Sequence, residues 1–296
     1  MSNIAAMENK KYSVEVLIKA FEDGLISVYP LEEIRGFVKW SFGFVCHFSS
    51  LELSLKIKEI LSDEHVKKLF GIIERLRTEE PIQYILGETE FYGLKILVNP
   101  NVLIPRPETE ELVDLIIKEN QNIEMKILDI GTGSGCIPIA LKKNLPKATI
   151  TGIDVSAKAL HTAKENAAMN GFEIDFREMS ILDEREVSGL PSFDIIVSNP
   201  PYITQKERPL MQKNVLNYEP HFALFVEDDD ALIFYRAIVD FALMHAAKET
   251  KVYWEINEAK DEELGQLLAE KGIADYSILK DLSGRNRMLK FILRGK

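Results

Sequence analysis

One short segment constrains the fold of this chain more than any other. Ile127–Ile130 is an apolar strand pattern that runs into Gly131-Thr132-Gly133-Ser134-Gly135 and then into a helical pattern. Glycines allow a tight turn and let the backbone approach a ligand that a Cβ would block. Cys136 stands where a dinucleotide fingerprint has its third glycine, so the turn favours a nucleoside without a pyrophosphate. A structural turn without a ligand is the alternative.

From residue 126 onward, strand and helix patterns alternate. The helices between the strands include 135–144 and 156–170. This alternation predicts an α/β fold, with a parallel-rich sheet covered by helices on both faces. The expected strands are 126–130, 148–153, 173–177, 193–198, 250–257, 276–280 and 288–293.

The first part of the chain has a different sequence pattern. Residues 1–80 carry apolar side chains at helical spacing, which predicts a small helical-bundle domain. Segments 82–86 and 91–98 have the pattern of short strands or a hairpin, and a new helix begins near Glu108. We therefore expect a helical domain at 1–80, a β-hairpin linker at 81–106 and an α/β domain at 107–296.

The composition is that of an ordinary soluble globular protein. A formal net charge of −11 argues against broad binding to nucleic acid or to an anionic membrane, and leaves a basic protein partner or a local basic patch open. With only two cysteines and no signal sequence, the chain is expected to be cytoplasmic. The five histidines show no metal-ligand spacing, so no metal site is expected.

Asp154 closes the second predicted strand, Thr149–Ile153. A carboxylate at this position can accept hydrogen bonds from both ribose hydroxyls of a bound nucleoside. The alternative interpretation is an acid at the start of the helix that follows Ser156. One side chain can serve both purposes.

Asn199-Pro200-Pro201-Tyr202 directly follows the strand Phe193–Ser198. The prolines remove two backbone donors and stiffen the turn, which fixes the nearby carbonyl groups. The Asn199 oxygen and a fixed carbonyl can then accept both N–H bonds of a substrate –NH₂ group. Tyr202 offers a flat face to a planar group. The turn predicts a site for a planar amide or amino nitrogen.

Together, the glycine turn and the Asn199–Tyr202 turn resemble the class I methyltransferases that modify planar nitrogens. Further segments resemble one branch, the peptide-chain release factor glutamine methyltransferases (the HemK/PrmC family). The most particular of these is Pro105–Glu110. The full set is Pro81–Gly87, Val102–Glu110, Tyr218–Pro220 with Ala223 and Leu224, and Asp281 through Gly284 to Arg287.

The resemblance implies a seven-stranded Rossmann-like sheet, S-adenosylmethionine as the methyl donor, S-adenosylhomocysteine as the product, and no metal. It implies that Asn199 and the Pro200 carbonyl hold the amide of a glutamine while its N5 is methylated, and that Tyr202 packs against that amide. The implied cofactor site is Gly131, Thr132, Gly133, Ser134, Gly135, Asp154, Ser180, Ile181 and Asn199, and the implied substrate site is Arg106, Asn199, Pro200, Pro201 and Tyr202.

Two segments depart from the family pattern. Where the family often has an acid that contacts adenine, this chain has Met179-Ser180-Ile181, so Ser180, Ile181 or Asp183 is the candidate. Glu227–Asp230 replaces the usual glycines and has the pattern of a solvated loop.

The resemblance also implies a partner: a release factor, docked by the helical domain, with no direct binding of nucleic acid. An adenine-N6 methylase acting on DNA or RNA is the alternative, because it shares the Asn-Pro-Pro-Tyr tetrapeptide. The acidic composition disfavours that alternative. The intact Asn199–Tyr202 turn disfavours a catalytically silent nucleoside-binding module.

Overall fold

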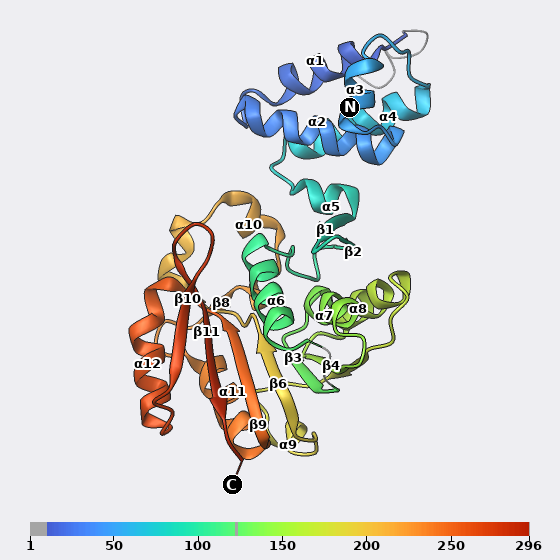
Figure 1. Cartoon of the computed structure of the whole chain (residues 1–296). Helices are drawn as coiled ribbons and strands as arrows, with labels where there is room; N and C mark the ends of the chain where they lie inside the picture. The colour runs from blue at the N-terminus through green and yellow to red at the C-terminus, as the bar shows by residue number, and fades with distance from the viewer. Residues whose placement is uncertain (1–10, 122–123, 296) are drawn as a thin grey trace. The chain divides into compact units, whose positions relative to one another are not determined.

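The computed structural model describes residues 11–121 and 124–295 (Figure 1). The chain divides into two compact units, Met1–Gly87 and Glu88–Lys296. We call them the helical unit and the sheet unit.

The helical unit is built from amphipathic helices with clear start signals. Ser13 and Ser62 accept hydrogen bonds from backbone N–H groups in the first turns of their helices, and Ser49 forms a capping box with Glu52. The apolar stripes of the longer helices meet in one core, which contains Phe21 and Leu69. The helices are α1 (Val14–Leu25), α2 (Leu31–Cys46), α3 (Ser50–Leu55), α4 (Asp63–Leu76) and α5 (Ile82–Leu86).

The prediction of a strand at 82–86 is wrong, because this segment is helix α5. The Pro81 carbonyl accepts hydrogen bonds from the N–H groups of Tyr84 and Ile85, and the helix ends at Gly87 with φ 77°. A five-residue segment is too short for the spacing of its apolar residues to separate a strand from a helical turn.

The predicted strand 91–98 is interrupted by a turn. Strands β1 (Glu88–Phe91) and β2 (Leu94–Leu97) form an antiparallel hairpin in which Phe91 pairs with Leu94. Tyr92 and Gly93 form the two-residue loop and have φ values of 50° and 67°. Positive φ at both positions is what a tight hairpin with twisted strands requires.

The sheet unit contains the predicted seven-stranded sheet, in the order β10-β11-β9-β6-β3-β4-β5. β11 is antiparallel to both of its neighbours, and the other pairs are parallel. Strand β9 begins at 246, earlier than predicted. The strands are β3 (Lys126–Ile130), β4 (Thr149–Asp154), β5 (Asp175–Glu178), β6 (Phe193–Ser198), β9 (Ala246–Glu255), β10 (Tyr276–Lys280) and β11 (Asn286–Leu293); β7 (Ile203–Thr204) and β8 (Phe225–Val226) form a separate pair.

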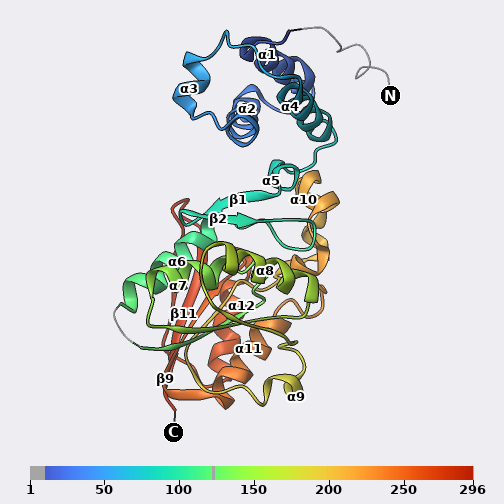
Figure 2. The same cartoon turned by 90° about the vertical axis from the view of Figure 1, so that its right-hand side faces the viewer.

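Helices cover both faces of this sheet (Figures 1 and 2). The hydroxyl of Tyr253 donates to Glu119 in α6, whereas the ring of the next residue, Trp254, lies 5.2 Å from that of Tyr235 in α11. None of the described helices is long and apolar enough to cross a membrane. The helices are α6 (Pro107–Glu119), α7 (Cys136–Asn144), α8 (Ala157–Met169), α9 (Glu184–Val187), α10 (Lys213–Tyr218), α11 (Ile233–Met244) and α12 (Asp261–Glu270).

The strand order reverses beside β3. Along the chain, β4 follows β3 on one side, and β6 then pairs with β3 on the other. Ligands of open α/β sheets bind in the crevice at the carboxyl ends of the strands where the order switches. The glycine turn, Asp154 and Asn199 all follow or close strands at this point.

Candidate active site

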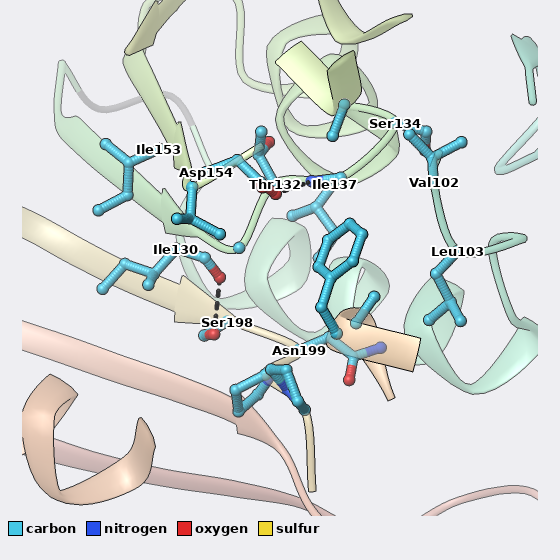
Figure 3. Close-up of a pocket in the computed structure, with 18 of the residues that line it drawn as sticks. Val102, Leu103, Ile130, Thr132, Ser134, Ile137, Ile153, Asp154, Ser198 and Asn199 are labelled. Carbon is cyan, nitrogen blue, oxygen red and sulfur yellow. Dashed lines mark hydrogen bonds between the residues drawn. The ribbon is translucent and has the colours of Figure 1, made fainter. Parts of the chain in front are cut away.

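A cavity of about 290 Å³ lies at the switch point. It is lined by the glycine turn, Asp154, Met179–Leu182 and Ser198–Pro201, and by the segment before α6 that includes Arg106. Figure 3 shows Thr132, Asp154 and Asn199 among the lining residues. Most of the predicted site residues are therefore brought together. Gly135, Tyr202 and the alternative adenine-contact candidate Asp183 do not line it.

The three glycines of the turn have positive φ values, 73° at Gly131, 54° at Gly133 and 78° at Gly135. Side chains other than hydrogen are strained in this region of conformational space. At Gly131 and Gly133 an added Cβ would meet nothing within 4 Å, so open space lies beside the turn. At Gly135 it would come within 3.1 Å of Ala163 and 3.2 Å of Phe176. Gly135 therefore lets α8 and β5 pack closely.

Asp154 is the last residue of β4, and its carboxylate faces the glycine turn. The two oxygens accept hydrogen bonds from the backbone N–H groups of Gly133 and Ser156, each at 2.9 Å. Burial raises the pKa of Asp154, and these N–H groups oppose the rise. The carboxylate thus braces the turn and also lines the cavity.

Ser180 and Ile181, which follow β5, form another wall of the cavity. The Ser180 hydroxyl accepts a hydrogen bond from the Leu182 N–H at 3.2 Å, and the Ser180 N–H donates to Glu186 at 2.6 Å. These bonds hold the backbone of the segment against the cavity. Asp183 does not line the cavity; it caps α9 instead.

The turn that begins at Asn199 is anchored on two sides. The Ser198 hydroxyl donates to the Ile130 carbonyl at 2.7 Å, which ties the end of β6 to β3 (Figure 3). The Asn199 Nδ2 group donates to the Thr109 hydroxyl at 3.1 Å. This bond engages the nitrogen end of the Asn199 amide, and Pro200 and Pro201 continue the cavity wall.

Tyr202 is not among the residues that line the cavity. Its hydroxyl donates to Glu255 Oε1 at 3.1 Å, and its ring packs against the core of the sheet unit. Burial, and then the neighbouring Glu255 carboxylate, raise the pKa of Tyr202 well above its usual range. The contact between Tyr202 and a substrate amide stays a prediction, and the observed geometry gives Tyr202 a supporting position.

Arg106 lies at the cavity and forms an ion pair with Glu219 at 2.5 Å. The other oxygen of Glu219 accepts a hydrogen bond from the Ile104 N–H at 3.2 Å. One buried carboxylate therefore joins the segment before α6 to the segment after α10. The sequence segments Pro105–Glu110 and Tyr218–Pro220 meet through this pair.

Sequence reasoning missed two buried polar residues next to the site, Thr109 and Glu255. Thr109 donates to Glu255 Oε2 at 2.6 Å. Burial raises the pKa of Glu255, against the effect of the hydroxyls of Thr109 and Tyr202. A signal was present, because Glu255 closes β9 just as Asp154 closes β4.

Within residues 11–121 and 124–295, no group of three or more histidine, cysteine or acidic side chains is arranged to hold a metal ion. The polar side chains that line the cavity are instead hydroxyls, the amides of Asn101 and Asn199, the guanidinium of Arg106 and the carboxylate of Asp154. This set of groups suits an organic ligand that forms hydrogen bonds.

Two family models and several curated relatives match this chain. The family model "Methyltransferase small domain" matches residues 108–218, and "PrmC N-terminal domain" matches residues 33–87. The release factor glutamine methyltransferase of Flavobacterium psychrophilum is 45% identical over 278 residues, which are 93% of this chain and 97% of that protein. The one from Bacteroides thetaiotaomicron is 42% identical over 90% of this chain and 95% of that protein.

One solved structure shows the same fold class. The catalytic domain of hMettl16, solved with the MAT2A 3′UTR hairpin 6, is 15% identical and has a TM-score of 0.51, with coverage of 80% of this chain and 84% of that chain. The release factor-specific protein-(glutamine-N5) methyltransferase of Alicyclobacillus acidocaldarius is 27% identical over 67% of this chain and 99% of that chain, with a TM-score of 0.41. On the extent and identity of its sequence relatives, this chain belongs to the release factor glutamine methyltransferase family.

Proposed function

We propose that this enzyme transfers a methyl group from S-adenosylmethionine to the side-chain amide nitrogen, N5, of a glutamine in a peptide-chain release factor. Family membership supports the reaction class. The observation that carries the proposal is the Asn199 amide. Its nitrogen end is tied to Thr109, and its oxygen end is left to accept a hydrogen bond at the cavity.

The residues at the cavity fit the cofactor. The open space beside Gly131 and Gly133 lets a ligand lie against the backbone of the turn. The Asp154 carboxylate has lone pairs beyond the two that accept backbone N–H groups, and these can accept the ribose hydroxyls. Ser180 and Ile181 would border the adenine. When bound, S-adenosylmethionine supplies an activated methyl group on its sulfonium and leaves as S-adenosylhomocysteine.

The protein must prepare an unreactive nucleophile. An amide nitrogen is a poor nucleophile because its lone pair is delocalised into the carbonyl group. Asn199 Oδ1 and the Pro200 carbonyl would accept the two N–H bonds of the glutamine amide, which aims the face of the nitrogen at the methyl group. The same fixed acceptors stabilise the positive charge that develops on nitrogen. The proton leaves after the methyl group has been transferred.

Arg106 and Tyr202 would act mainly by holding the walls of the site. Arg106 fixes the segment before α6 through Glu219. Tyr202 fixes Glu255, which in turn accepts from Thr109. Pro201 keeps the turn stiff beside the substrate amide.

Methyl transfer to a purified release factor tests this proposal. Radiolabelled S-adenosylmethionine is supplied together with release factor, DNA or RNA, and the labelled product is digested and mapped. We expect label in one glutamine-containing peptide of the release factor and none in nucleic acid. A release factor variant with that glutamine replaced by asparagine is the matched control. Label in adenine would contradict the proposal and favour the N6-methylase.

We further propose that the helical unit docks the release factor. A chain that begins at Glu88 retains all the residues of the cavity. If it stays folded, it should bind S-adenosylmethionine normally and methylate a short glutamine peptide, but lose most methylation of the intact release factor. Equal rates for the truncated and full chains on the intact factor would show that the helical unit has no docking role.

A further inference from the structure

A continuous line of hydrogen bonds runs away from the cavity through three residues. Asn199 Nδ2 lies 3.1 Å from the Thr109 hydroxyl, which lies 2.6 Å from Glu255 Oε2. The residues come from three separate elements: the turn after β6, the first turn of α6 and the last position of β9. Thr109 and Glu255 are each only 2% exposed, so bulk water does not compete for these bonds.

The chemistry of the groups gives this line a direction. An ionised carboxylate only accepts hydrogen bonds. The Thr109 hydroxyl must therefore use its single O–H to donate a hydrogen bond to Glu255. Its oxygen is then an acceptor toward Asn199, and only the Nδ2 end of the Asn199 amide can meet it. Oδ1 is thereby left as the acceptor for a substrate N–H. A protonated Glu255 could donate to Thr109 and reverse every bond, which would turn Nδ2 toward the substrate.

The surroundings of Glu255 hold the carboxylate in place. Tyr202 donates to its second oxygen, and the Tyr235 hydroxyl donates to its backbone carbonyl at 2.9 Å. The positive charge of Arg287, whose guanidinium also pairs with Asp281 at 3.6 Å, favours the ionised form. The negative charge of Glu108 opposes it.

We propose that Thr109 and Glu255 are positioning residues that select which end of the Asn199 amide faces the substrate nitrogen. The inference rests on the proposed function and deepens it. Neither residue exchanges a proton with the substrate in this scheme, because both act through Asn199. Glu255 does not line the cavity at all.

Thr109→Val and Thr109→Ser form a matched pair, because valine keeps the shape and loses the hydroxyl, whereas serine keeps the hydroxyl. Single-turnover rates on release factor are measured at saturating S-adenosylmethionine. Thr109→Val should be slower by about tenfold or more, since it leaves a buried amide donor unsatisfied and the amide free to turn. Thr109→Ser should recover most of the rate. Equal rates for the two variants would overturn the inference.

The pH profile separates positioning from a merely structural role. Because burial raises the pKa of Glu255, the wild-type rate should fall as pH decreases through that pKa and Glu255 takes up a proton. Glu255→Gln should be slower at neutral pH and should lose this acid limb, because a neutral amide does not titrate. The measurement is made at saturating cofactor, so that protonation of Asp154 does not enter through binding. An unchanged acid limb in Glu255→Gln would contradict the role of Glu255.

A second readout does not depend on the substrate. The side-chain NH₂ signals of Asn199 are assigned by NMR from their loss in Asn199→Ala. They should exchange with solvent more rapidly in Thr109→Val than in Thr109→Ser or wild type. If the wild-type enzyme left release factor unmodified but the signals behaved as described, the proposed function would fail while the positioning of Asn199 would stand. Identical exchange in both variants would refute the positioning itself.

Discussion

The two units of this chain bury different kinds of side chain. Within the described part of the helical unit, Ser41 is the one buried polar residue, and the rest of the core is apolar. The sheet unit buries many polar groups, including the carboxylates of Asp129, Asp154, Glu219 and Glu255. A buried carboxylate costs free energy unless it is hydrogen-bonded or paired. The sheet unit thus carries the residues that apolar packing alone would not select. Of these carboxylates, Asp154 lines the cavity, whereas Glu219 and Glu255 hold Arg106 and Thr109, which line it.

The largest expected effect concerns the free-energy cost of burying the Asp129 carboxylate. Asp129 is fully buried, and burial raises its pKa from 3.8 to about 7, against the opposing effect of the Thr132 hydroxyl. Between these values only the unfolded chain ionises, so stability falls as pH rises. Asp129→Asn should therefore stabilise the sheet unit by up to about 4 kcal/mol above pH 7 and by little below pH 4.

Urea unfolding at pH 4 and pH 8 checks this prediction. Each unit holds one tryptophan, Trp40 and Trp254, and Trp254 is fully buried in the sheet unit. Its fluorescence in a Trp40→Phe background reports on the sheet unit. A gain that is the same at both pH values would show that Asp129 is not held neutral.

The matching experiment in the helical unit removes apolar volume. Leu69 is fully buried in the core of that unit. Leu69→Ala should lower the stability of the helical unit by about 3 kcal/mol, from lost burial and the cavity left behind. Hydrogen exchange measured unit by unit would show faster opening of α4. Calorimetry should find S-adenosylmethionine binding unchanged; a marked loss of affinity would mean that the two units are less independent than their cores suggest.

Asn199→Ala should slow turnover on the order of 100-fold, comparable to the loss of one oxyanion-hole donor, with little change in cofactor affinity. Asn199→Asp keeps an acceptor and nearly the same shape but loses the donor to Thr109. Its rate should fall between those of the alanine variant and the native enzyme. Single-turnover measurements on release factor decide the order, and a native-like rate for Asn199→Ala would overturn the mechanism.

The smallest expected effect concerns Asp154. Asp154→Ala should weaken S-adenosylmethionine binding by about 1–3 kcal/mol, through the loss of hydrogen bonds to a charged acceptor. Because Asp154 also accepts the N–H groups of Gly133 and Ser156, the thermal midpoint is measured alongside the affinity. Asp154→Asn is the control that keeps the shape. Unchanged affinity in a folded alanine variant would remove Asp154 from the cofactor site.

The sequence predicted the seven strands because strand length, apolar runs and glycine turns agree with one another in that region. It failed at 82–86, because this five-residue segment next to Pro81 is too short for its apolar residues to show a period. It also missed the turn at Tyr92, because a tyrosine with positive φ is an uncommon hairpin residue.

The site was predictable to the extent that its residues follow strands. Asp154 and Asn199 stand at strand ends, and strand ends of a parallel sheet meet at one edge. Thr109 and Glu255 were not predicted, because their pairing depends on how α6 lies across β9, a tertiary contact that the position of Glu255 at a strand end does not reveal by itself. The side chain of Tyr202 depends on the same contact.

Register in the sheet has a consequence for how this enzyme can fail. Ser198 of β6 is paired with Trp254 of β9, so the residues that follow, Asn199 and Glu255, emerge beside each other. Side chains alternate between the two faces of a strand, and a shift of β9 by one position would send Glu255 to the opposite face. Such a misfolded sheet could keep most of its pairing and its cofactor cavity. The result would be a compact protein that binds its methyl donor and cannot aim it.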